Sequence, residues 1–125
     1  MAILNILFVT RQNEIVQDLE QGMLKGHFID IAKKGAAAKH FLRGNTCPYH
    51  LIIIDERLED MPGHILMEWI YTKHPAAHVA GVSENLSAWP EMAGQFSHIA
   101  KYFNSGNNSL AWRKADLERI FLAIT

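Results

Sequence analysis

Short runs of branched apolar residues alternate along the chain with segments in which apolar residues recur every three or four positions. Such runs predict buried strands, whereas the three-to-four spacing predicts helices that pack by one face. We therefore expect five strands, at residues 3–9, 27–32, 49–54, 78–82 and 97–103. The second of these runs is the most polar, which predicts that it lies at the edge of the sheet.

Helical patterns fill the intervals between these strands. The first places Ile15, Leu19 and Met23 four residues apart and has Gly26 as a candidate stop. The other four are expected at 36–42, from Gly63 to the break at Pro75, from Ser87 onward, and over the last residues around Leu117 and Phe121. Strictly alternating strands and helices predict a three-layer α/β/α, doubly wound parallel sheet of five strands in a single domain spanning 1–125.

Composition and charge narrow the classes of function. The chain has 125 residues, is 49% hydrophobic and carries a net charge of −1. That charge gives no long-range attraction to nucleic acid or an anionic membrane, so we expect neither partner. Cys47 is the only cysteine, which excludes an internal disulfide and agrees with a cytoplasmic location. No apolar run approaches the roughly 20 residues needed to span a bilayer.

In a doubly wound sheet, binding sites form at the carboxyl ends of the strands. Asp55 directly follows four aliphatic residues, and a carboxylate there can attack a phosphoryl group. Ser83 ends the fourth expected strand and can donate to a phosphoryl oxygen, and Lys101 in the fifth can neutralise an anion. Each residue alone is as well explained as a helix cap, a turn residue or a surface lysine. Their occurrence at three successive strands favours a shared phosphoryl site.

The segment 51–63, LIIIDERLEDMPG, resembles the phosphorylation strand and following loop of response-regulator receiver domains (CheY-like). In that family an aliphatic strand ends in the phosphoacceptor aspartate, and a glycine opens the next helix eight residues later, where this chain has Gly63. Ser83 and Lys101 also follow the family's order. The resemblance implies the flavodoxin-like strand order 2-1-3-4-5 and a role in two-component (phosphorelay) signal transduction. It also implies that Asp55 is the phosphoacceptor, with Ser83 and Lys101 as its catalytic partners.

The chain departs from the receiver pattern at several of the positions that matter for chemistry. Receivers carry two adjacent acidic residues after the first strand, and this chain has Thr10 and Arg11. The family's proline after the lysine is Tyr102, and its switching aromatic residue, three positions before the lysine, is His98. The proline that the family places four residues after the aspartate is Glu59.

These departures reverse the formal charge of the expected pocket. Three carboxylates and a lysine become Asp55, Arg11 and Lys101. Mg²⁺ prefers carboxylate and water oxygens, so we expect it to bind weakly and assign no cofactor. If Mg²⁺ binds, the resemblance implies Asp55 and the backbone carbonyl of Arg57 as ligands. Arg11 can instead pair with Asp55 and occupy the pocket, which is the interpretation we favour, or join Lys101 in holding an anion.

Three functions follow from these observations. The favoured one is an atypical receiver that regulates through protein contacts, with Mg²⁺-dependent phosphorylation weak or absent and no enzymatic activity beyond self-phosphorylation and dephosphorylation. The alternatives are a conventional phosphoryl-accepting response regulator, and a small anionic-ligand-binding domain of the same fold. By resemblance, the partners are a histidine kinase, a phosphotransfer protein or an effector. A homodimer would form through the fourth helix, fifth strand and fifth helix, where Trp89 and Trp112 are expected.

Overall fold

The computed structural model describes residues 3–11, 25–83, 98–104 and 110–112, with side chains for 3–11 and 25–81. The elements in these ranges are β1 (Asn5–Val9), β2 (Phe28–Ala32), α2 (Gly35–Phe41), β3 (Leu51–Asp55), α3 (Gly63–Lys73), β4 (Val79–Ser83), β5 (His98–Asn104) and β6 (Leu110–Trp112). The helices expected before residue 25, after Ser87 and at the carboxyl end lie outside the described residues. Gly26, the candidate stop of the first helix, has a left-handed backbone with φ of 90°.

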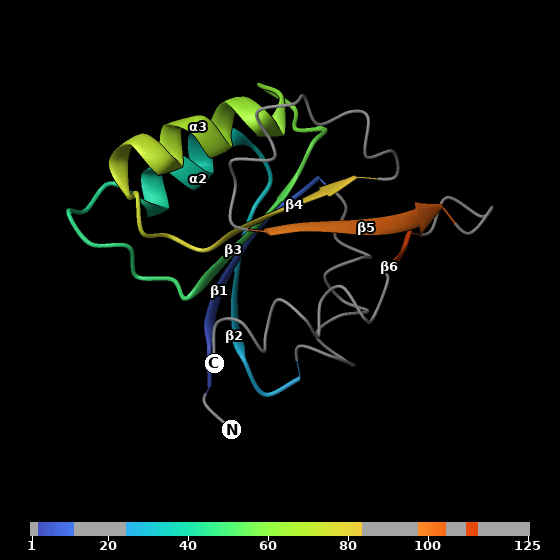
Figure 1. Ribbon diagram of the computed structural model, residues 1–125, viewed down its shortest axis with the longest axis horizontal. Helices are drawn as coiled ribbons and strands as arrows, with labels where there is room; N and C mark the ends of the chain where they lie inside the picture. Colours follow the sequence, from blue (N-terminus) through green and yellow to red (C-terminus); the bar gives the residue numbers. More distant parts are fainter. Residues whose placement is uncertain (1–2, 12–24, 84–97, 105–109, 113–125) are drawn as a thin grey trace.

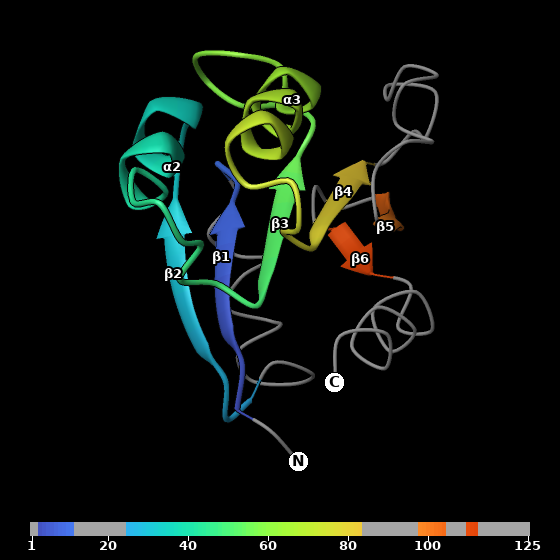
Figure 2. The ribbon, with the colours of Figure 1, turned by 60° about the vertical axis from the view of Figure 1, so that its left-hand side comes forward.

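All the described strands belong to one sheet, in the order β2-β1-β3-β4-β5-β6. Strands β1 to β5 pair in parallel, so the predicted order 2-1-3-4-5 is confirmed. The most polar strand, β2, lies at the edge, as its composition predicted. Figures 1 and 2 show α2 and α3 side by side on one face of this twisted sheet.

The end of the sheet differs from the prediction. Strand β6 pairs antiparallel with β5, so that Trp112 lies opposite Tyr102, whereas we expected Trp112 in the last helix. The sequence carries the reason, because a Gly-containing polar stretch between two apolar runs is typical of a hairpin. The prediction extended the last helix back to Trp112 because the apolar residues that follow it, around Leu117 and Phe121, have helical spacing.

The core explains why the central strands are apolar at nearly every position. On one face, Leu7 and Ile54 pack in a cluster with Leu66 and Ile70 of α3. On the other face Phe8 is also fully buried, as is Ile53. Strands covered on both faces cannot tolerate polar residues, so their sequences read as continuous aliphatic runs. The first polar residue at the end of such a strand is therefore a candidate functional residue.

Candidate functional site

The backbone register brings the predicted strand ends to one edge of the sheet. Val9 pairs with Ile54, so Thr10 follows β1 beside Asp55 at the end of β3. Asp55 in turn pairs with Val82, and Ser83 pairs with Lys101. The side chains of Ser83 and Lys101, and those of His98 and Tyr102, lie outside the described part of the structure. Their catalytic and pocket roles therefore stay predictions, although the backbone places Ser83 and Lys101 opposite each other at the expected edge.

Asp55 is buried, with 2% of its surface exposed. Its Oδ2 accepts a hydrogen bond of 3.1 Å from the hydroxyl of Thr10, which is itself fully buried. Its Oδ1 accepts a hydrogen bond of 3.1 Å from the backbone N–H of Arg57. Each carboxylate oxygen thus has a donor, and one of these donors is the residue that stands where a receiver has an acid.

Arg11 does not pair with Asp55. Arg11 is exposed, and it forms no ion pair with Asp55 among the described residues. The favoured interpretation of the sequence, an Asp55 occupied by Arg11, is therefore wrong. The physical reason is the alternation of side chains along an extended backbone, because Thr10 faces Asp55 and the next residue then points away.

The described residues around Asp55 do not fit a Mg²⁺ ion. Mg²⁺ requires closely spaced oxygen ligands and is held in proteins chiefly by carboxylates. Here the neighbour on β1 is a neutral hydroxyl that already donates to Oδ2, and the next residue is a cation. Among the residues that the structure describes, no group of three or more His, Cys, Asp or Glu side chains can hold a metal ion. We therefore assign no metal ligand role to Asp55 or to the Arg57 carbonyl.

Gly63 allows α3 to begin directly against the end of β3. Its backbone N–H donates to the carbonyl of Glu56 at 2.8 Å. A Cβ atom at this position would collide with the carbonyl oxygen of Asp55 and lie 2.9 Å from Cα of Glu56. The eight-residue spacing from Asp55 to Gly63 thus has a steric cause, since only glycine permits this approach of helix and strand.

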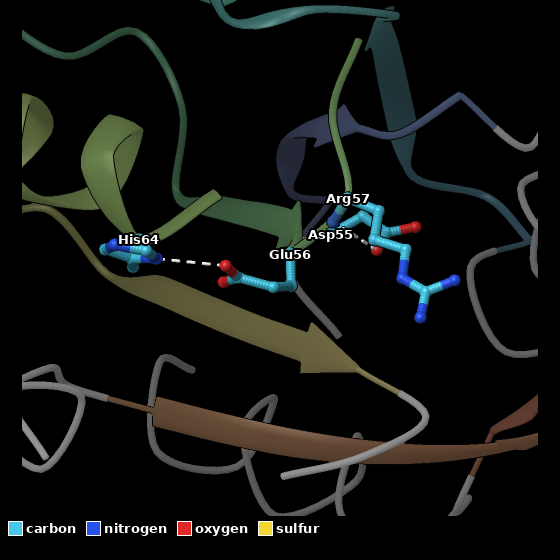
Figure 3. Close-up of polar contacts among 4 residues, drawn as sticks. All are labelled: Asp55, Glu56, Arg57 and His64. Carbon is cyan, nitrogen blue, oxygen red and sulfur yellow. Dashed lines mark hydrogen bonds and ion pairs between the residues drawn. The ribbon is translucent and has the colours of Figure 1, made fainter. Parts of the chain in front are cut away.

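A second carboxylate lies next to Asp55 and forms a pair that the sequence did not reveal. Oε1 of Glu56 is 2.9 Å from Nδ1 of His64, and Figure 3 shows the Glu56 side chain reaching toward α3 while Arg57 points the other way. Burial raises the pKa of Glu56 above 4.5, with the nearby Asp55 adding to this effect, and the contact with His64 opposes it only in part. The other oxygen, Oε2, is buried and has no hydrogen-bond partner.

The loop between β3 and α3 is tied to the neighbouring helix by Asp60. Its two carboxylate oxygens accept hydrogen bonds of 2.7 Å and 3.0 Å from the backbone N–H groups of Gly35 and Ala36, at the start of α2. Desolvation is the largest single effect and raises the pKa of Asp60, but these two bonds, the backbone N–H of Asp60 itself and the nearby charge of Lys34 together lower it below its ordinary value. The loop that follows Asp55 is therefore anchored at Gly63 and at Asp60.

An open hollow beside Asp55 carries charges of both signs. Arg11 and Arg57 line it together with the carboxylates of Glu56, Glu59 and Asp60. Because the carboxylates offset the two cations, the described lining has no excess of positive charge to hold an anion. This feature gives no support to the alternative of an anionic-ligand site built around Arg11.

Comparison with known proteins places this arrangement in a fold. No family model matches the chain, and no curated protein matches its sequence. Solved structures do match, among them a CheY-like response regulator receiver domain from Methanospirillum hungatei, with a TM-score of 0.73 and 18% identity over 98% of this chain and 94% of that one. A CheY-like receiver domain from Methylobacillus flagellatus gives 0.74 and 18% over 99% and 100%. The response regulator TrrA from Thermotoga maritima, solved in complex with Mg²⁺-BeF, gives 0.72 and 20% over 97% and 98%.

The chain therefore has the fold of the response-regulator receiver domains, over nearly its whole length. The strand order and the position of Asp55 at the carboxyl end of β3 agree with that fold. Within the described ranges, no helix has the length and apolar character required to cross a membrane.

Proposed function

We propose that this chain is an atypical receiver of two-component signal transduction, which regulates a protein partner through contacts. In it, Mg²⁺-dependent phosphorylation of Asp55 is weak or absent. The observation that carries this proposal is the hydrogen bond from Thr10 to the buried carboxylate of Asp55. It replaces, at the same strand end, a carboxylate that would help hold a metal ion.

The chemistry of phosphoryl transfer supports this view. Transfer to a carboxylate is accelerated by positive charge placed on the oxygens of the transferring group, and Mg²⁺ commonly supplies that charge. In this chain Lys101 alone is expected to supply it beside Asp55, since Arg11 is exposed and makes no ion pair with that carboxylate. Ser83 would orient a phosphoryl oxygen where transfer occurs. Without the metal, such transfer should be slow.

The partner classes follow from the same proposal. A receiver that is not switched efficiently by phosphorylation can still present a surface to a histidine kinase, a phosphotransfer protein or an effector. We propose a cytoplasmic location for it and no enzymatic activity beyond reactions at Asp55. The proposed homodimer through the fourth helix, β5 and the fifth helix involves segments outside the described residues, and it rests on the resemblance alone.

The experiment that tests this function is phosphorylation by a small phosphoryl donor, read by intact mass. We expect no stoichiometric adduct on the chain in the presence of Mg²⁺, and at most a trace that is lost in Asp55→Asn. A stoichiometric adduct that requires both Asp55 and Mg²⁺ would overturn the proposal in favour of a conventional phosphoryl-accepting regulator.

A further inference from the structure

Two lysines converge on one aromatic ring where α2 and α3 lie side by side. Nζ of Lys39 is 5.4 Å from the centroid of the Trp69 ring, and Nζ of Lys73 is 5.6 Å from it. Both distances are within the range of cation–π attraction, which stabilises an ammonium group over an indole face. Lys39 and Lys73 each lie in the last turn of their helix, so both helices bring a cation to the same end of this face.

The helix dipole accounts for a lysine in each last turn but not for their convergence. A cation near a helix carboxyl end is favoured on each helix separately. Nothing in that effect requires both cations to lie on one ring, where they repel each other. Here neither Lys39 nor Lys73 forms an ion pair in the part of the chain that the structure describes.

The surrounding sequence strengthens the positive charge. The segment 33–43 contains four lysine or arginine residues and no acid, and Arg43 is exposed just beyond the end of α2. On α3 the only carboxylate is Glu68, which forms no ion pair within the described residues. Since the whole chain has a net charge of −1, this positive charge is a local feature of one face.

We propose that Lys39, Trp69 and Lys73, here named the lysine–tryptophan patch, form a docking surface for an acidic segment of a protein partner. The lysines supply charge complementarity, and the half-buried ring of Trp69 offers apolar contact between them. Aspartate and glutamate side chains would replace the water around the ammonium groups, and an aliphatic residue between them would pack on the indole.

An acidic protein segment fits this surface better than nucleic acid does. A nucleic acid gains affinity by many phosphate contacts along an extended basic surface, whereas this patch centres on two lysines at one ring. The patch is compact, with an aromatic centre, and it lies at the last turns of α2 and α3, whereas Asp55 lies near their first turns. A partner held there would leave the Asp55 edge accessible.

The test is fluorescence anisotropy of the full chain with a labelled peptide of repeated Asp-Glu-Leu triplets at about 50 mM salt, where screening is modest. We expect saturable binding that weakens about threefold in Lys39→Gln and in Lys73→Gln, and about tenfold in the double variant, as loss of exposed charge contacts implies. The matched control is Lys25→Gln, an exposed lysine outside the patch, which should bind as the parent does. The double variant with arginine at both positions should retain binding.

Three results would overturn the proposal. The first is the absence of saturable binding to the peptide. The second is an equal loss in Lys25→Gln, which would reveal only diffuse electrostatic attraction. The third is tighter binding of a single-stranded DNA of equal charge than of the peptide. Melting curves of each variant verify that the Lys→Gln changes leave the fold intact, so a loss of binding reports on the patch itself.

Discussion

Thr10 places a neutral hydroxyl beside Asp55, at a position where the receiver pattern has an acid. A carboxylate beside Asp55 would repel it unless a cation lay between them, whereas the Thr10 hydroxyl donates to it at 3.1 Å. The same substitution therefore removes a candidate metal ligand and supplies a hydrogen-bond donor. A buried carboxylate that has its own donors is stable without a metal, and this is the basis of the atypical character that we propose.

The contribution of that hydrogen bond can be measured with Thr10→Val. We expect the free energy of unfolding to fall by about 1–3 kcal/mol, because a buried carboxylate oxygen loses a donor. Thr10→Ser, which keeps the hydroxyl, is the control and should lose less. Urea denaturation of the three proteins measures the difference. A valine variant as stable as the parent would show that the hydrogen bond contributes nothing.

Glu56 makes folding stability fall as pH rises, whereas a carboxylate with a lowered pKa makes stability fall as pH drops. Its pKa in the folded protein is raised above 4.5 by burial, so the folded chain binds this proton more tightly than the unfolded chain does. The contribution of protonated Glu56 to the free energy of unfolding is therefore present at low pH and is lost as pH rises through the raised pKa. We expect the stability of Glu56→Gln relative to the parent to increase as pH rises above 4.5.

Denaturation in urea at several pH values measures this trend, with Glu59→Gln as the matched change at an exposed carboxylate of the same loop. A difference between Glu56→Gln and the parent that does not vary with pH would contradict the role assigned to burial of Glu56.

At the scale of elements, the sequence predicted what depends on burial and periodicity. The strands β1, β3 and β4 are mostly apolar because their central residues are buried, and α3 begins at the glycine that the spacing indicated. The short strand β6 was missed because only three residues form it, too few for a period to be recognised. Its pairing with β5 depends on a hairpin, which local apolar spacing does not encode.

The contact between α3 and the end of β3 is tested by comparing two glycines. Gly63→Ala should lower the free energy of unfolding by about 1–3 kcal/mol or more, because its new methyl group would meet the backbone of Asp55 and Glu56. Gly35→Ala should be tolerated better, since the atoms in its way belong to the flexible side chain of Met61. Thermal melts of both variants make the comparison, and an equal loss of stability in the two would contradict the steric explanation.

In the candidate site too, the sequence predicted the residues at strand ends but not those whose contacts depend on a loop. Asp55, Ser83 and Lys101 were identified because strand ends in a parallel sheet share one edge, and the backbone register agrees. The direction of Arg11 could not be obtained, because a residue at a strand end can face either way. The Glu56–His64 pair depends on the path of the loop between β3 and α3, and neither residue carries a periodic signal of its own.

For the whole molecule, charge separates two regions with different chemistry. The Asp55 edge has a buried carboxylate, a hydroxyl donor and loops of mixed charge, whereas the lysine–tryptophan patch has cations without ion pairs in the described residues. In the functions proposed above, phosphoryl transfer would take place at the first region and the acidic partner would bind at the second. The two regions then need not compete for one surface.

The most direct test of the central claim is calorimetric titration of Mg²⁺ into the chain and into the double variant Thr10→Asp/Arg11→Asp. The variant places acids at the two positions after β1 where the receiver pattern has them, which removes the Arg11 cation and adds carboxylate oxygens at this end of β1. We predict binding heat for the variant, lost when Asp55→Asn is added, and none above dilution for the parent chain. Mg²⁺ binding by the parent that matches the variant in affinity and depends on Asp55 would contradict the account.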